Sequence, residues 1–75
     1  MKNLFDPPKT ANLNLIGLDG NAFSLMGAFS AQARRETWTK SEIDAVLSEC
    51  MSGDYDHLLQ TLMAHCDDQG FGDAD

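Results

Sequence analysis

The chain has 75 residues, of which 43% are hydrophobic, and its twelve Asp and Glu outnumber five Lys and Arg for a formal net charge of −7. A chain of this length buries only roughly 60% of the surface that its unfolded form exposes, which leaves material for one core and excludes a second. The hydrophobic fraction excludes a disordered polyelectrolyte. The acidic balance argues against nucleic acid as a direct ligand, because phosphate backbones are bound through Lys and Arg.

The first part of the chain favours irregular structure. Residues 1–12 are expected as a flexible arm, because Pro7 and Pro8 fix two φ angles and remove two backbone donors. Residues 13–16 alternate in polarity before a glycine-rich turn, which fits a short extended segment of undetermined pairing. No apolar run approaches the roughly 18 residues that span a bilayer, and no signal-peptide core is present. We therefore expect a cytoplasmic protein without membrane contact.

A first helix is expected over residues 21–36, with Asp19 or Asn21 supplying the capping oxygen. Its apolar residues recur at the spacing of one helix face. These residues are Ala22, Leu25, Met26, Phe29 and Ala33.

The rest of this helix is also unusually apolar. Phe23 lies outside the stripe, and no charged residue occurs between positions 22 and 33. Gly27 and Ala31, four positions apart, leave a smooth patch where another backbone could approach closely. Because Gly27 lowers intrinsic helix stability by about 1 kcal/mol relative to alanine, packing is its expected role. We interpret Phe23, Gly27 and Ala31 as a surface for self-association.

A second helix is expected over residues 40–51. Thr39 and Glu42 have the spacing of a capping box, and Trp38 and Ile43 have that of a hydrophobic staple, so the tryptophan is expected to be structural. One apolar face follows, and Gly53 ends the helix. This face consists of Ile43, Val46, Leu47, Cys50 and Met51.

A third helix is expected over residues 55–66, capped by Asp54, and the short link 52–54 predicts a helical hairpin. Its predicted buried face consists of Tyr55, Leu58, Leu59, Leu62, Met63 and Cys66. The prediction is thus an all-α, three-helix domain over residues 13–66. The composition of residues 67–75 is typical of a disordered acidic tail.

Charge is unevenly distributed along the chain. Residues 1–40 hold five bases and three acids, whereas residues 41–75 hold nine acids and no base. Acids that lie off the apolar stripes are expected to face solvent. The four that we interpret as a partner-binding acidic face are Glu42, Asp44, Glu49 and Asp56. Such a face either keeps the protein soluble or docks a basic partner, which could be a nucleic-acid-binding protein.

No group of residues predicts catalysis or a cofactor. His57 and His65, eight positions apart on one helix, are separated by roughly 12 Å along its axis, too far for one metal ion. Cys50 and Cys66 fall at opposite ends of the predicted hairpin, so we expect two buried free thiols. The chain has no glycine-rich phosphate loop. We therefore expect neither an enzyme nor a metal site.

Three stretches resemble a family of short uncharacterised proteins from bacterial, phage and plasmid genomes. They run from Asn14 to Phe23, from Ala33 to Ile43, and from Ser52 to Leu59, the last with the sequence Ser-Gly-Asp-Tyr-Asp-His-Leu-Leu. The similarity covers roughly residues 12–66 and brings no activity with it. Thr37 departs from the pattern, which has glycine before the tryptophan. The resemblance implies a mobile-element context.

Three functional hypotheses follow. The first is an interaction module, an inhibitor or adaptor that binds a basic surface stoichiometrically. The second is a homodimer with the helix over 21–36 as its core, because small chains often supplement a thin interior in this way. The third and weakest is a DNA-binding regulator that uses Arg34, Arg35 and Lys40 at a helix-turn-helix-like joint.

Overall fold

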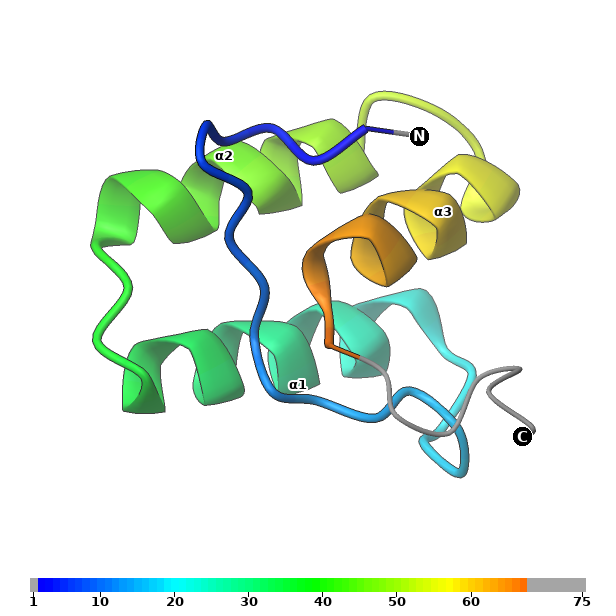
Figure 1. Cartoon of the computed structure of the whole chain (residues 1–75). Helices are drawn as coiled ribbons and strands as arrows, with labels where there is room; N and C mark the ends of the chain where they lie inside the picture. Colours follow the sequence, from blue (N-terminus) through cyan, green and yellow to red (C-terminus); the bar gives the residue numbers. More distant parts are fainter. Residues whose placement is uncertain (1, 68–75) are drawn as a thin grey trace, which may run out of the picture.

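The computed structural model describes residues 2–67 and contains the helices α1 (Ala22–Arg35), α2 (Lys40–Cys50) and α3 (Tyr55–His65). No strand occurs within these residues, so the all-α prediction is confirmed, and each helix lies within one residue of its predicted bounds. Helices α2 and α3 form the predicted hairpin, and α1 packs against both (Figure 1). Of the helices described, none has the length and apolar character needed to cross a membrane.

Each helix begins at a side-chain cap predicted from the sequence. Asn21 Oδ1 accepts hydrogen bonds from two N–H groups in the first turn of α1, at 2.8 and 3.3 Å. The capping box of α2 is complete: Glu42 N–H donates to Thr39 Oγ1 at 3.1 Å, and Thr39 N–H donates to Glu42 Oε1 at 2.8 Å. Asp54 Oδ1 caps α3 at 2.9 Å. Local sequence therefore fixes where all three helices start.

Helix α1 ends in a Schellman motif. Trp38 N–H donates to Ala33 O and Thr37 N–H donates to Arg34 O, each at 3.0 Å. This motif needs a residue in the left-handed region, and Thr37 has φ 67°. Glycine suits the position best, because it has no Cβ atom. The turn forms with threonine nevertheless, and it places Trp38 in the core.

The core lies where the three helices meet, and most of the predicted apolar positions are in it. Met51, Tyr55 and Met63, expected on buried faces, are instead 63%, 47% and 42% exposed. Thr61 and His65, which were not predicted to be buried, are fully buried. The chain before α1 covers the side of α3 on which they lie. The buried apolar residues are Ala11, Leu25, Met26, Phe29, Ala33, Trp38, Ile43, Val46, Cys50, Leu58, Leu62 and Cys66.

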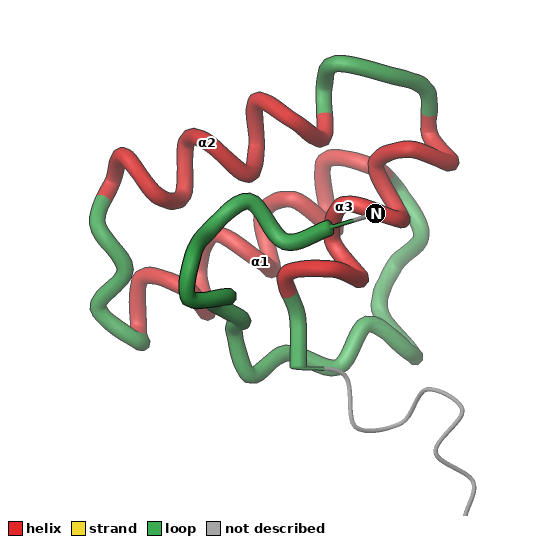
Figure 2. Tube along the Cα trace, turned by 45° about the horizontal axis from the view of Figure 1, so that its top comes forward, coloured by secondary structure: helices red, strands yellow, loops and turns green. Residues whose placement is uncertain are grey.

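The N-terminal segment, residues 2–12, crosses the helices and is packed on them (Figures 1 and 2). Asn3 Nδ2 donates to Ala64 O at 2.9 Å. Ala11 N–H donates to His65 O at 2.9 Å, and Ala11 O accepts from Asp67 N–H at 2.7 Å. The packed unit thus begins before the predicted boundary at residue 13.

The backbone pairing of this region falls at Ala11, which forms an isolated bridge with Cys66, and not in the extended segment expected over 13–16. Residues 13–16 pair with no strand among the described residues, and the end of α3 pairs with Ala11 instead. Apart from Asp67, the predicted tail over 67–75 lies outside the described residues.

Trp38 joins the N-terminal segment to the helices. Its ring meets those of Phe5 and Phe29 edge to face, with centroids 5.7 and 5.4 Å apart. Lys9 Nζ lies 5.2 Å from the same ring, within cation–π range. Trp38 is 6% exposed, which confirms the structural role predicted for it.

Candidate functional site

Glu42 and Glu49, two of the predicted partner-binding acids, are half-buried and held within the chain. Glu42 Oε1 lies 2.8 Å from Lys9 Nζ and also accepts the N–H of Thr39. The hydrogen bond from Lys9, followed by that from Thr39, lowers the pKa of Glu42 below its ordinary 4.5. Glu49 Oε2 lies 2.9 Å from His57 Nε2. Both carboxylates are therefore committed to contacts that stabilise the fold.

Asp44 and Asp56, the other two predicted acids, are exposed as expected. Asp44 Oδ2 pairs with Lys40 Nζ at 2.7 Å, one turn earlier on α2. Asp56 Oδ2 accepts a hydrogen bond from Gln60 Nε2 at 3.1 Å. Pairs this exposed contribute little to stability, so these two carboxylates can exchange partners at low cost.

Cys50 and Cys66 are free and buried, as the sequence predicts. Burial, with a smaller contribution from the charge of Glu49, raises the pKa of the Cys50 thiol to about 11. A thiol that stays protonated at neutral pH is a poor nucleophile and a poor metal ligand. Over residues 2–67, no three His, Cys, Asp or Glu side chains are grouped so that they could hold a metal ion.

The outer face of α1 carries the predicted self-association residues, and all three are exposed. Phe23 is 78% exposed, although it is a large apolar side chain. A Cβ atom added to Gly27 would meet nothing within 4 Å. The close backbone approach expected at Gly27 is therefore not made within the chain, and the smooth surface from Phe23 to Ala31 is open to a second molecule.

A larger apolar surface surrounds Tyr55. Two hollows, of about 210 and 270 Å³, lie on either side of its ring, one towards the loop before α1 and the other towards the loop between α2 and α3. The Tyr55 hydroxyl donates to Gly20 O, which holds the ring between them. We call this surface the Tyr55 face. Its exposed apolar members are Ile16, Leu18, Phe23, Met51, Tyr55 and Met63.

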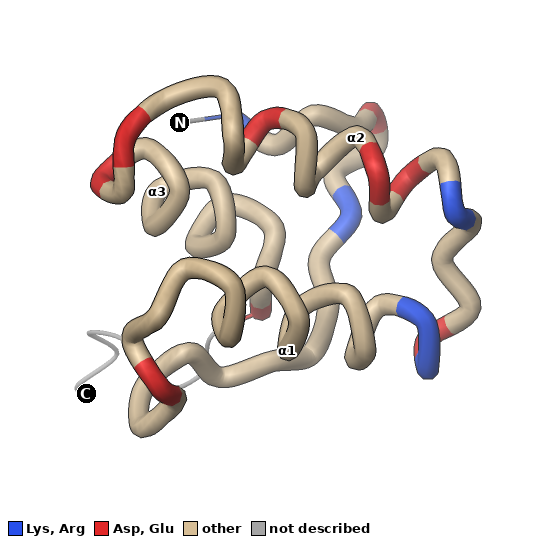
Figure 3. The backbone as a smooth tube through the Cα atoms, turned by 180° about the vertical axis from the view of Figure 1, so that it is seen from behind, with Lys and Arg blue, Asp and Glu red and all other residues tan. Residues whose placement is uncertain are grey.

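Acidic residues border the Tyr55 face. Asp19 follows Leu18 in the loop before α1, and Asp54 lines the second hollow. Figure 3 shows acids in the loop before α1 and at the start of α3, whereas the bases of α1 and α2 gather at the opposite end, around the turn between these helices. The face thus combines an apolar centre with a negative border.

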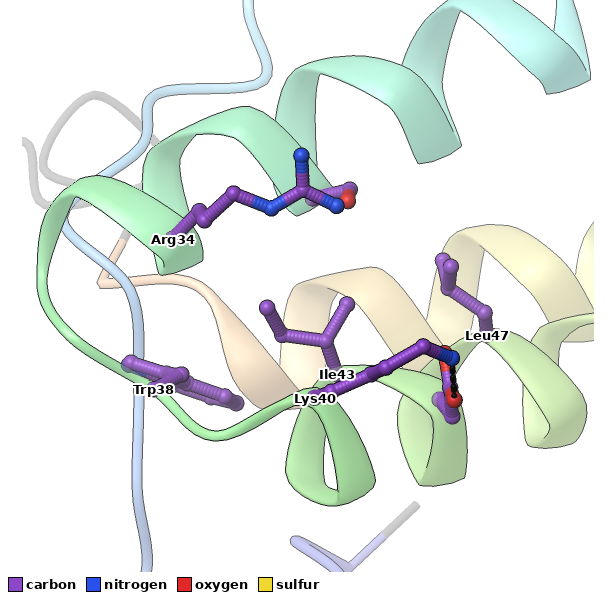
Figure 4. A pocket seen from close by; sticks show the side chains of 7 residues that line it. Arg34, Trp38, Lys40, Ile43 and Leu47 are labelled. Carbon is purple, nitrogen blue, oxygen red and sulfur yellow. Dashed lines mark hydrogen bonds and ion pairs between the residues drawn. The ribbon is translucent and has the colours of Figure 1, made fainter.

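The second candidate site is a cleft of about 400 Å³ between α1 and α2, at the basic end (Figure 4). Ile43 and Leu47 point from α2 into it, and the side chain of Arg34 lies along α1 on the other side of the gap. We call it the α1–α2 cleft. Its lining residues are Ser30, Arg34, Trp38, Lys40, Ile43, Asp44 and Leu47.

Helical periodicity did not predict the Tyr55 face, because it places Met51, Tyr55 and Met63 on buried faces, although they stand at the ends or edges of their stripes. Arg34 and Lys40 of the α1–α2 cleft were expected at the joint between the two helices, but the cleft itself was not. Apolar side chains within a glycine-rich loop, such as Ile16 and Leu18, were the available signal for an exposed apolar surface.

No family model, curated protein or solved structure matches this chain. The family resemblance over residues 12–66 therefore stays a prediction.

Proposed function

We propose that the protein is a small interaction module, an inhibitor or adaptor that binds another protein stoichiometrically through the Tyr55 face. The observation that carries this proposal is the group of six large apolar side chains exposed around two adjoining hollows. Single exposed apolar residues are ordinary, but a contiguous apolar patch with a polar border is typical of a protein–protein contact.

The border indicates the chemistry of the partner. Asp19, Asp54 and Asp56 lie near the face, and residues 41–67 contain neither Lys nor Arg. A negative border speeds association with a basic surface and disfavours acidic competitors. The face therefore suits a basic amphipathic helix, with apolar anchors for the two hollows and Lys or Arg on its flanks. This assignment places the docking surface beside Asp56 and away from Glu42.

An NMR titration with a synthetic amphipathic helix that carries leucine anchors and lysine flanks tests the proposal, with a glutamate-flanked peptide as its control. The lysine peptide should shift resonances of the Tyr55 face, saturate at one peptide per chain, and bind more weakly as salt is raised. The substitution Phe23→Ser should weaken binding by about tenfold, as expected for an interface anchor. Ala31→Ser, on the same helix outside both hollows, should leave binding unchanged.

Two results would count against the proposal. One is equal binding of the two peptides, and the other is an equal effect of Phe23→Ser and Ala31→Ser. A natural partner retained from host lysate should show the same dependence on Phe23. Both variants should melt at the temperature of the unsubstituted protein, since both side chains are exposed.

A second candidate function, a homodimer with α1 at its centre, is favoured by the open surface from Phe23 to Ala31. Light scattering over a dilution series should then give a mass of twice 8.2 kDa. Gly27→Leu should convert the dimer into a folded monomer, because the larger side chain would block a close approach of the second chain, while a Cβ atom at this position meets nothing within 4 Å in its own chain. A monomer at every concentration of the unsubstituted protein would exclude this candidate.

A further inference from the structure

Arg34 borders the α1–α2 cleft from α1 and has no anionic partner among residues 2–67. Its side chain extends from the last turn of α1 and faces Ile43 across the gap (Figure 4). The ion pairs found among residues 2–67 do not include Arg34, whereas Lys40, on the same cleft, is paired with Asp44. The guanidinium of arginine is more weakly hydrated than the ammonium of lysine, and it binds a carboxylate through two parallel hydrogen bonds.

The rest of the cleft is suited to an apolar group. Ile43 and Leu47 project into it from α2, and Trp38 closes one end. Its volume of about 400 Å³ falls in the range of small-molecule sites, which are lined mainly by apolar side chains with a few polar groups that orient the ligand. Arg34, a cation outside the ion pairs of residues 2–67, and an apolar floor of Ile43 and Leu47 call for a ligand with both kinds of surface.

Electrostatics limits that ligand to a single negative charge. The chain carries a net charge of −7, which repels polyanions at long range. Asp44 also lines the cleft, opposite Arg34, and its carboxylate already occupies the ammonium group of Lys40. A second anionic group on the ligand would therefore meet the Asp44 carboxylate and would have to compete with it for the ammonium group of Lys40.

We propose that the α1–α2 cleft binds a small monocarboxylate with an aliphatic or aromatic body. The carboxylate pairs with Arg34, and the apolar body packs on Ile43 and Leu47. The cleft shares no lining residue with the two hollows of the Tyr55 face, so this site is independent of the proposed function.

Trp38 makes the proposal directly measurable, because it is the one tryptophan of the chain and it lines the cleft. Titration with octanoate below its micelle concentration should give a saturable change in tryptophan fluorescence. Octanol, which has the same chain and no charge, should bind at least about tenfold more weakly, as expected for loss of a charge-assisted pair. This comparison uses the unaltered protein.

Two variants that each lose one positive charge test where the carboxylate of the ligand binds. Arg34→Gln should weaken octanoate binding by about tenfold or more. Arg35→Gln removes the same charge from the next residue, which does not line the cleft, and should change binding less than about twofold by long-range screening alone. Arg34→Lys keeps the charge but loses the planar guanidinium. Its affinity for octanoate should therefore fall between those of Arg34→Gln and Arg35→Gln.

The proposal is overturned if octanoate gives no saturable change in Trp38 fluorescence, if octanol binds as tightly as octanoate, or if Arg34→Gln and Arg35→Gln weaken binding equally. Melting temperatures check that the variants fold. A shift of the Ile43 methyl resonances on addition of octanoate gives a second readout inside the cleft, and its absence would likewise contradict the assignment.

Discussion

The backbone N–H of Leu4 donates to Nε2 of His65 at 2.9 Å, across 61 positions of the chain. The other ring nitrogen, Nδ1, lies 2.7 Å from Thr61 O, one turn earlier in α3. Since Nε2 accepts and Nδ1 faces a carbonyl, the ring is neutral with its proton on Nδ1. His65 is fully buried, so water cannot replace either bond if the ring is lost.

His65→Leu should therefore lower the free energy of unfolding by roughly 1–3 kcal/mol, the cost of leaving buried polar groups without a partner. Urea denaturation measures this change, and hydrogen exchange at Leu4 should become faster as the N-terminal segment loosens. His57→Leu is the matched control, because the side chain of His57 is 32% exposed and its partner Glu49 remains accessible to water. Equal losses in the two variants would contradict the role assigned to His65.

Thr37→Gly should stabilise the protein. A β-branched residue in the left-handed region is strained by roughly 1–2 kcal/mol, part of which is offset by the greater freedom of glycine in the unfolded chain. We expect a net gain of about 1 kcal/mol in urea denaturation. Thr37→Ala keeps a Cβ atom at this φ and should gain much less. A glycine variant no more stable than the alanine variant would show that the turn is not strained.

Two glycines should respond to alanine with opposite signs. Gly27→Ala adds a methyl group in open space within a helix and should raise stability by up to about 1 kcal/mol. At Gly53, an added Cβ atom would lie 2.9 Å from the Cβ atom of His57, so the start of α3 must shift. Gly53→Ala should lower stability by roughly 1–3 kcal/mol. Thermal melts of both variants at low protein concentration provide the comparison.

The contact between Lys9 and Glu42 should make stability depend on acid pH. Because the folded state lowers the pKa of Glu42, its contribution is present above pH 4.5 and is lost as the pH falls below that value. Glu42→Gln keeps the cap on α2 but weakens the Lys9 contact, so it should lower the melting temperature at neutral pH. That difference should shrink as the solution is acidified below pH 4.5. A difference independent of pH would exclude the ionic contribution.

The two thiols should be inert in the folded protein. Burial raises the pKa of Cys50 to about 11, and Cys66 is 5% exposed. Ellman's reagent at about pH 8, where an ordinary thiol reacts readily, should therefore modify neither cysteine in the native state. Both should react once the chain is unfolded in urea. Rapid native modification of Cys50 would contradict its burial against α1 and α3.

The helices were predictable because their signals are local. Asn21, Thr39 and Asp54 each cap a helix within three residues of their own position, and the apolar spacing identifies α1 and α2 without knowledge of the rest of the fold. The Schellman turn at Thr37 could not be predicted from the sequence, because threonine gives no signal for a left-handed conformation.

The candidate sites could not be predicted in the same way, since they depend on contacts between distant residues. Lys9 neutralises Glu42 from 33 positions away, which removes that carboxylate from the expected acidic face. His65 lies in the core because residues 3–11 cover it, and α3 consequently turns Tyr55 and Met63 outward. Helical periodicity marks an apolar face but does not indicate which edge of it a non-helical segment will cover.

The pairing of Ala11 with the end of α3 imposes an order on biosynthesis. Residues 3–11 leave the ribosome before the three helices, yet their partners Ala64, His65 and Asp67 are synthesised more than fifty positions later. Helix α1 and the α2–α3 hairpin can form from local contacts while translation continues. Until Asp67 emerges, Phe5 and one side of Trp38 have no cover. The nascent chain is therefore most vulnerable to proteases and chaperone capture at its N-terminal segment, and that segment becomes protected only in the last step of folding.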